Sequence, residues 1–223
     1  MNKVKLISYS QPTDEVRAEG IDDGLELVAF CARVSNPSNQ MNKATSAKLV
    51  RYLIKHAHWS PLEMISACME IETPRDIARQ ILRHRSFSFQ EFSQRYANPV
   101  DDLTFVYREA RLQDQKNRQN SIVINDEYLK DRWEEEQAKV ILAAKTAYQW
   151  AIDNGIAKEC ARVVLPEGNT MSRMYMNGTI RSWIHYIELR SAHGTQAEHI
   201  DVAKACAKVI ATVFPLELGE VNV

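Results

Sequence analysis

Apolar residues recur at helix or strand spacing over most of the chain, and the two spacings divide it into a series of regular elements. Alternation indicates strands over residues 4–9, 64–72, 103–107 and 171–176. Periods of three to four residues indicate helices near residues 25–32, 49–54, 74–85, 126–154, 157–165 and 180–187, with a last helix ending before Pro215. The fold class expected is therefore α+β, mostly helical, with a small mixed or antiparallel sheet.

The clearest single junction is the one between the strand at 64–72 and the helix that follows it. Thr73 is expected to cap this helix, with Pro74 at its first helical position. The helix is expected to run to about Arg85, because nothing before that residue breaks its period. Its spacing would place three arginines on one stripe: Arg75, Arg79 and Arg83.

Other local signals set the remaining boundaries. Asp22 and Asp23 are expected to cap the helix at 25–32, and Thr195–Glu198 is expected to form a capping box for the last helix. The polar segments 11–20 and 108–120 show no clear period and are predicted to be loops. Because no linker-like segment or internal repeat divides the chain, residues 1–223 are expected to form one domain.

Composition and charge narrow the class of protein. The chain has 45% hydrophobic and 26% charged residues, which is ordinary for a soluble globular protein. Its net charge of −1 provides no overall attraction to nucleic acid or to an anionic membrane. No apolar run approaches the ~18 residues that span a bilayer, and the first residues do not resemble a signal peptide. We therefore expect a cytoplasmic protein with no membrane or nucleic-acid partner.

The spacing of the cysteines, histidines and glycines excludes several common kinds of functional site. Cys31, Cys68, Cys160 and Cys206 are scattered without a Cys-x-x-Cys pair, so they are expected to be reduced core thiols. His56 and His58 are too close in sequence to share a helix face, and no metal site is expected. The glycine-rich dinucleotide and phosphate loops, His-Glu-x-x-His and Gly-x-Ser-x-Gly are all absent from the sequence.

The most informative stretch is Arg83–Tyr96, in which arginines, a glutamate and aromatic residues alternate. Arginine offers a planar fork for phosphate or a carbonyl edge, while Glu91 can accept from an imide or a ribose hydroxyl. The interleaved aromatic rings make a fully solvated turn unfavourable. The pattern indicates a nucleotide site, and the alternative is a structural ion pair of Glu91 with Arg95 or Arg85.

This stretch also resembles a known family. Arg83-His84-Arg85, followed after seven residues by Ser93, is similar to the signature of the flavin-dependent thymidylate synthases. Further similar blocks keep the family's order and lie at residues 58–63, 78–80, 161–166, 181–183 and 185–190. The resemblance extends from about residue 25 to residue 210.

The resemblance implies reductive methylation of dUMP to dTMP. Methylenetetrahydrofolate would be the carbon donor, FAD the redox carrier and NADPH the reductant, with tetrahydrofolate released. The family's sites lie between the subunits of a homotetramer, so several contacts would come from different chains. Since no cysteine lies in the signature, the flavin would supply the hydride while the protein supplies orientation and electrostatics.

The resemblance also implies roles for particular residues. Those expected to bind dUMP are Gln80, Arg83, Glu91, Phe92, Ser93, Gln94, Arg95, Arg162 and Arg190. Those expected to bind FAD are Ser60, Arg83, His84, Arg85, Glu91, Thr179, Arg181 and His185. His58 and Tyr96 would lie near folate and flavin, and Arg190 would stabilise negative charge on the uracil ring as the catalytic residue. Thr179 departs from the asparagine that many family members carry.

Two other functions remain open from the residues alone. A non-catalytic nucleotide-binding or single-stranded RNA-binding module could use the basic, aromatic-rich stretch, and it would bind with a strong salt dependence. A metal-dependent hydrolase could use His56 and His58, and it would lose activity to chelators.

Overall fold

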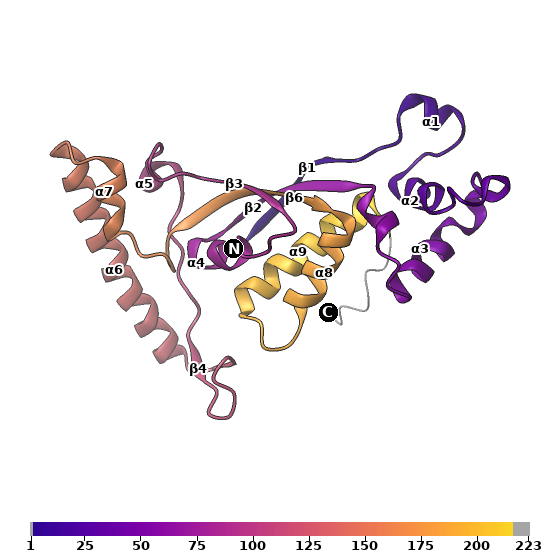
Figure 1. The fold of residues 1–223 in the computed structure, drawn as a ribbon. Helices are drawn as coiled ribbons and strands as arrows, with labels where there is room; N and C mark the ends of the chain where they lie inside the picture. The colour runs from indigo at the N-terminus through magenta and orange to yellow at the C-terminus, as the bar shows by residue number, and fades with distance from the viewer. Residues whose placement is uncertain (1, 216–223) are drawn as a thin grey trace.

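A four-stranded antiparallel sheet runs through the middle of the molecule (Figure 1). The coordinates are a computed structural model that describes residues 2–215. In spatial order the strands are β1 (Lys3–Tyr9), β2 (Ser66–Pro74), β6 (Met171–Thr179) and β3 (Ser88–Glu91). The expected α+β class with a small antiparallel sheet is confirmed, and three of the four predicted strands are present.

The alternation of β2 fixes which face of the sheet is buried. Ala67, Met69 and Ile71 are buried, while the residues between them are only partly buried. In the register with β6, Met69 lies opposite Met176 and Ile71 opposite Met174, so four apolar side chains meet on one face. Since strand side chains have a period of two, a slip of one residue would expose this entire set.

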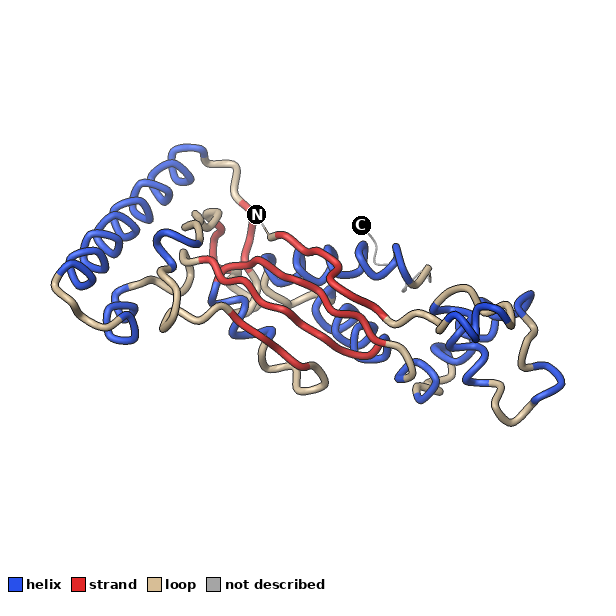
Figure 2. The backbone as a smooth tube through the Cα atoms, turned by 90° about the horizontal axis from the view of Figure 1, so that it is seen from above, coloured by secondary structure: helices blue, strands red, loops and turns tan. Residues whose placement is uncertain are grey.

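Two helices cover that face. They are α8 (Ile180–Ser191), which follows β6 directly, and α9 (Ala197–Val213), which contacts β1 and β2. In Figure 2 the strands lie above these helices, and the opposite face of the sheet has no helix over it. The buried Trp183 ring of α8 packs beneath the sheet, and its Nε1 donates to the Ala67 carbonyl at 3.0 Å. The principal core is therefore a single layer between sheet and helices.

Most of the remaining helices lie at the two ends of the sheet (Figure 1). At one end are α2 (Gly24–Ala32), α3 (Ser46–Lys55) and the 3-10 turns η1 (Pro37–Asn39), η2 (Lys43–Thr45) and η3 (Ser60–Glu63). At the other end are the long α6 (Glu127–Asp153), α7 (Lys158–Ala161) and η4 (Arg162–Val164). Asp23 caps α2, as the sequence predicts, by accepting the Glu26 backbone N–H. Asp126 caps α6 in the same way by accepting from the Leu129 N–H.

The predicted helix at 74–85 is shorter than expected. It is α4 (Arg75–Ile81), and Thr73 belongs to β2, where it pairs with Ser172 instead of capping the helix. After Ile81 the chain turns, and β3 then pairs with the edge of β6. The strand pairing and the burial of Phe87 outweigh the local helical period, so Arg83 and Arg85 lie outside the helix.

Three segments differ from the predicted pattern. Residues 103–107 form no strand and contribute only an isolated bridge between Phe105 and Thr170; the short α5 (Pro99–Asp102) precedes them. The predicted loop 11–20 contains α1 (Asp14–Ala18), which Thr13 caps. The predicted loop 108–120 contains β4 (Arg111–Gln113), which pairs with β5 (Ser121–Val123).

Two smaller predictions are also wrong. The capping box at Thr195–Glu198 does not form: Gln196 is the N-cap of α9 and its side chain makes no cap bond, because its amide bonds Glu198 and Gln80 instead. Cys160 is exposed and is not a core thiol, whereas Cys206 is fully buried. Across residues 2–215, every helix is too short or too polar to cross a membrane.

Candidate active site

The first half of the signature is held by one buried ring. Phe87 is buried, and its ring lies 4.8 Å from that of Trp183 on α8. Opposite it stands Gly178 of β6, where an added Cβ would lie 2.4 Å from a Phe87 ring carbon. The absence of a side chain at Gly178 lets the ring reach the core. With Phe87 anchored, Arg83 and Arg85 are exposed on the turn.

His84 faces Arg190 of α8. The Arg190 Nε–H donates to His84 Nε2 at 2.8 Å, and the His84 ring meets the edge of Tyr186 at 4.9 Å. Burial and the neighbouring Arg190 and Arg83 charges lower the pKa of His84 to about 4. His84 is therefore neutral at pH 7 and acts as an acceptor for Arg190. The structure thus brings together two residues that the sequence assigned to flavin and to nucleotide.

Gln80 lies beside this pair, on α4, and is bonded to the start of α9. Its Nε2 donates to Gln196 Oε1 at 2.8 Å, and its Oε1 lies 3.3 Å from His199 Nδ1. Sequence reasoning missed His199, which is fully buried. A signal was available, because His199 falls on the same stripe of α9 as the buried Val202 and Ala203.

Glu91, at the end of β3, is held by three groups. Ser172 Oγ donates to it at 2.8 Å, and Arg79 and Arg75 lie 3.3 and 3.6 Å away. The alternative ion pair with Arg95 or Arg85 does not form. Both partner arginines belong to the stripe that the sequence placed on α4, so that stripe was the available signal for this site.

The second half of the signature runs toward α7. The Phe92 N–H donates to the Arg173 carbonyl at 2.8 Å, and Arg95 pairs with Glu159 at 3.1 Å. Ser93 accepts from the Arg95 backbone N–H at 3.4 Å. Gln94 is buried, and its Nε2 has no partner among residues 2–215.

Two further predicted residues lie near this half of the signature. Tyr96 is 81% exposed, and its carbonyl accepts from Lys158 Nζ at 2.9 Å. Arg162 opens η4, directly after α7. Tyr96 therefore faces solvent, while Arg162 is half-buried.

The remaining predicted flavin residues gather around η3 and the first turns of α8. Arg181 pairs with Glu63, the last residue of the η3 turn that begins at Ser60, and the His185 ring lies 4.4 Å from that of Trp59. The Thr179 hydroxyl caps α8 by accepting from the Ser182 N–H at 3.3 Å. That hydroxyl therefore already has a structural role.

His58 lies at the same end of the molecule as this group. It is exposed, and its ring is 6.1 Å from Tyr52 and 6.4 Å from His56. In the described part of the chain, no group of three or more His, Cys, Asp or Glu side chains could hold a metal ion.

One protomer does not bring all the predicted residues together. The α7 group with Arg95 and Arg162 and the η3 group with Arg181 and His185 lie near opposite ends of the sheet (Figure 1). His84, Arg190 and Gln80 lie between them, under the sheet. The side chains that the sequence assigned to nucleotide and those it assigned to flavin are therefore separated along one chain.

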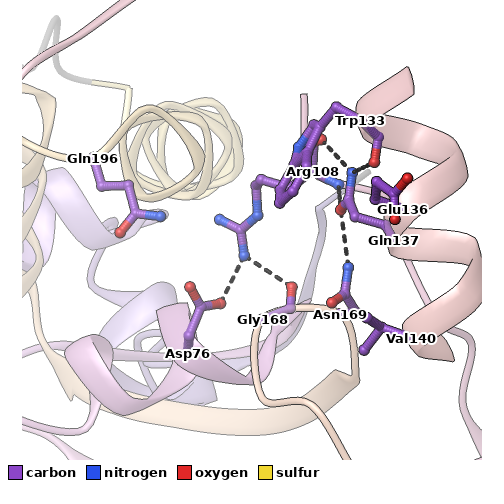
Figure 3. Close-up of a pocket in the computed structure, with 9 residues that line it drawn as sticks. All are labelled: Asp76, Arg108, Trp133, Glu136, Gln137, Val140, Gly168, Asn169 and Gln196. Atoms are coloured by element: carbon purple, nitrogen blue, oxygen red, sulfur yellow. Dashed lines mark hydrogen bonds and ion pairs between the residues drawn. The ribbon is translucent and has the colours of Figure 1, made fainter. Parts of the chain in front are cut away.

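A cavity of about 420 Å³ opens between α4, α6 and the start of α9. Figure 3 shows Arg108 extending between Gln196 and α6, with its guanidinium bonded to Asp76 and to the Gly168 carbonyl. None of the predicted site residues lines this cavity. Its lining does include Gln196, which bonds Gln80.

Residues 18–216 match the family model described as thymidylate synthase complementing protein. The chain belongs to this family. A viral relative, the probable flavin-dependent thymidylate synthase of Paramecium bursaria Chlorella virus 1, is 49% identical over 211 residues, covering 95% of this chain and 94% of its own length. The flavin-dependent thymidylate synthase of Synechocystis sp. is 45% identical over 213 residues, covering 95% of each chain.

A solved structure supports the same assignment. The UMP/dUMP methylase PolB of Streptomyces cacaoi, bound with 5-Br dUMP, aligns with a TM-score of 0.80 and 26% identity, covering 96% of this chain and 92% of that one. The family resemblance seen in the sequence is therefore confirmed. So are the fold and the class of enzyme, a flavin-dependent thymidylate synthase.

Proposed function

We propose that this enzyme converts dUMP to dTMP with methylenetetrahydrofolate as carbon donor, FAD as cofactor and NADPH as reductant. The observation that carries the proposal is the Arg190 to His84 bond at 2.8 Å, beside Gln80, since it joins the signature to the last motif block. The names of the two relatives and the brominated dUMP in the PolB complex support the same substrate class.

The residues proposed to bind dUMP fall into three groups of suitable chemistry. Gln80, Arg83 and Arg190 offer N–H donors near the middle of the molecule. Glu91 offers an acceptor whose charge Arg75 and Arg79 stabilise. The remainder are on the stretch toward α7 and comprise Phe92, Ser93, Gln94, Arg95 and Arg162. Arg95 and Arg162 supply the positive charge that a phosphate requires.

Arg190 is proposed to be the catalytic residue. A guanidinium carries five N–H donors, and His84 occupies only one of them. Because His84 is neutral, it orients the guanidinium without cancelling its charge. The remaining N–H donors of Arg190 are then available to stabilise negative charge that develops on the uracil ring. Such charge is stabilised most strongly by donors that are already held in place.

The chain also carries side chains that fit FAD. Arg83 and Arg85 are exposed, so both guanidinium groups are accessible to a pyrophosphate, and His185 with Trp59 offers an aromatic surface. The proposed FAD residues are Ser60, Arg83, His84, Arg85, Glu91, Thr179, Arg181 and His185, with His58 and Tyr96 near folate and flavin. Bound FAD supplies the hydride for the methyl group.

The positions of these groups support a proposal that sites are shared between subunits. Since the phosphate-binding and flavin-binding groups lie near opposite ends of one chain (Figure 1), we infer a homotetramer in which neighbouring subunits complete each site. Residues 1–223 are proposed to act as one domain in the cytoplasm, with dUMP and folate as small-molecule partners and without nucleic acid or membrane.

The deciding experiment is a complete reaction with the purified full-length chain. We expect a bound yellow flavin, dUMP-dependent NADPH oxidation and formation of dTMP. UMP should be assayed in a parallel reaction, because PolB is named for both nucleotides. Absence of flavin together with absence of dTMP would reject the proposal. Salt-dependent binding of single-stranded RNA without turnover would favour the binding-module alternative.

A cysteine variant separates this chemistry from that of cysteine-dependent thymidylate synthases. Cys160 is the one exposed thiol in the described part of the chain and lies two residues before Arg162. Cys160→Ser is expected to retain dTMP formation, because the flavin and not a thiolate enables the reaction. Loss of turnover in this variant with its fold intact would point to a nucleophilic cysteine.

A further inference from the structure

Glu198, in the first turn of α9, is an ion-paired carboxylate next to the site. Arg108 Nη1 lies 3.0 Å from Glu198 Oε2, and Arg111 pairs with Oε1. Burial raises the pKa of Glu198, but the bonds from Arg111 and Gln196 and the Arg108 charge lower it more, so the net shift is downward. Glu198 is therefore ionised at neutral pH and can only accept hydrogen bonds.

This carboxylate fixes the orientation of two amides in turn. Gln196 Nε2 donates to Glu198 Oε2 at 3.0 Å, because only the NH₂ end of an amide can face a carboxylate. Gln196 Oε1 then faces Gln80, whose Nε2 donates to it at 2.8 Å. Gln80 Oε1 is consequently turned away from Gln196.

The alternation of donors and acceptors continues through His199 to Tyr186 of α8. Gln80 Oε1 faces His199 Nδ1 at 3.3 Å, so Nδ1 must carry the ring proton. His199 Nε2 is then an acceptor, and the Tyr186 hydroxyl at 3.1 Å donates to it. His199 and Tyr186 are both buried, so their bonds are shielded from bulk water and strengthened by the low local dielectric.

We propose that Glu198 and His199 are positioning residues that hold the Gln80 amide in one orientation for the nucleotide. The inference rests on the proposed function, in which Gln80 binds dUMP. Gln80 keeps one free N–H and one free lone pair after its two bonds. A reversed amide would present a lone pair where the ligand requires a donor, so the network selects ligands by donor and acceptor pattern.

The first test is Glu198→Gln in the full-length holoenzyme. The glutamine side chain has the same shape as glutamate, but its NH₂ group must face either Gln196 or an arginine, all of which are donors. Gln196 can then turn over, so the orientation of the Gln80 amide is no longer unique. The expected result is an increase of about tenfold in KM for dUMP, equivalent to about 1.4 kcal/mol, with kcat nearly unchanged. Glu135→Gln, which removes an exposed partner of Arg132 on α6, is the matched control and should leave both constants unchanged.

Two His199 variants separate positioning from packing. Asparagine places its NH₂ near the position of Nδ1, and glutamine places its amide near that of Nε2. His199→Asn should therefore keep a donor for Gln80 and a near-normal KM, whereas His199→Gln should raise KM by about tenfold. Equal KM values for the two variants, or an unchanged KM in Glu198→Gln, would overturn the proposal.

A readout without substrate keeps this proposal separate from the proposed function. Solid-state ¹⁵N NMR of histidine-labelled protein reports the His199 tautomer directly. We expect the Nδ1–H form in the natural chain and a mixture of tautomers in Glu198→Gln. The Nε2–H form in the natural chain would overturn the positioning network. If dTMP were not formed while the Nδ1–H form was observed, the proposed function would fail and the hydrogen-bond network that orients Gln80 would stand.

Discussion

Arg190 Nε donates to His84 Nε2 across 2.8 Å, and this bond joins residues that are 106 positions apart in sequence. It connects the turn after α4 to the last full turn of α8. Because burial and two arginines keep His84 neutral, the bond leaves the charge of Arg190 undiminished. A charge held in place before substrate arrives costs no reorganisation when negative charge develops.

Arg190→Lys is expected to lower kcat/KM by about 100-fold without unfolding the protein. Lysine has one point charge and no planar fork, so it cannot both bond His84 and present several donors to a ligand. Steady-state kinetics with dUMP varied would measure the loss. Arg132→Lys on the surface of α6 serves as control and should retain full activity; an equal loss there would mean that the effect is not local.

Glu91→Gln is expected to reduce the free energy of unfolding by about 1–3 kcal/mol. The substitution leaves Arg75, which is 6% exposed, with less compensating charge and weakens the bond from Ser172. Urea unfolding of the flavin-free protein would measure the change. Glu135→Gln, at an exposed ion pair, should change stability by less than about 0.5 kcal/mol, and an equal effect at both positions would contradict the argument.

Gly178→Ala is expected to destabilise the protein by about 1–3 kcal/mol and to weaken flavin binding. Its Cβ would lie 2.4 Å from the Phe87 ring, so Phe87 and the turn that carries Arg83 and Arg85 would have to move. Thermal unfolding and flavin titration would measure the two effects. Gly168→Ala, where an added Cβ meets nothing within 4 Å, is the matched control.

A second substitution tests whether the Phe87 contact causes the effect. Phe87→Leu provides space at the same position, so the double variant Gly178→Ala with Phe87→Leu should lose less stability than the two single changes added together. Strict additivity of the two losses would show that another contact of Gly178 is responsible.

Stability is expected to decrease below about pH 6.5, where an unfolded histidine takes up a proton. Burial, Arg190 and Arg83 lower the pKa of His84 to about 4. Burial, Arg190 and His84 lower that of His199 to about 3. Between these values and pH 6.5 the unfolded chain binds more protons than the native one, so stability is present above that window and is lost as the pH falls through it.

The size of this dependence can be measured by urea unfolding of flavin-free protein at several pH values. Each buried neutral histidine contributes at most about 1.4 kcal/mol per pH unit, and the partly exposed His84 contributes less. His199→Leu should reduce the slope between about pH 6.5 and pH 5. An unchanged slope in that variant would mean that other groups control the acid transition.

Local elements were predictable where the chain's own pattern agrees with its packing. The alternation of β2, the Asp23 cap of α2 and the apolar period of α8 are all as predicted. Predictions failed where a distant partner outweighed a local signal. Thr73 has the sequence context of a helix cap, yet pairing with Ser172 of β6 keeps it in a strand.

The sequence by itself determined the family, the order of the motif blocks and the residue types available for nucleotide and flavin, because these depend on chemistry and spacing along the chain. Only the tertiary structure decided their partners: Arg75 and Arg79 for Glu91, and His84 for Arg190. It also placed His199 beside Gln80 and connected Glu198 to Gln80 through Gln196. The physical reason is that a hydrogen bond depends on distance and direction in space, and residues on different elements of the chain acquire both only when the sheet and its helices pack together.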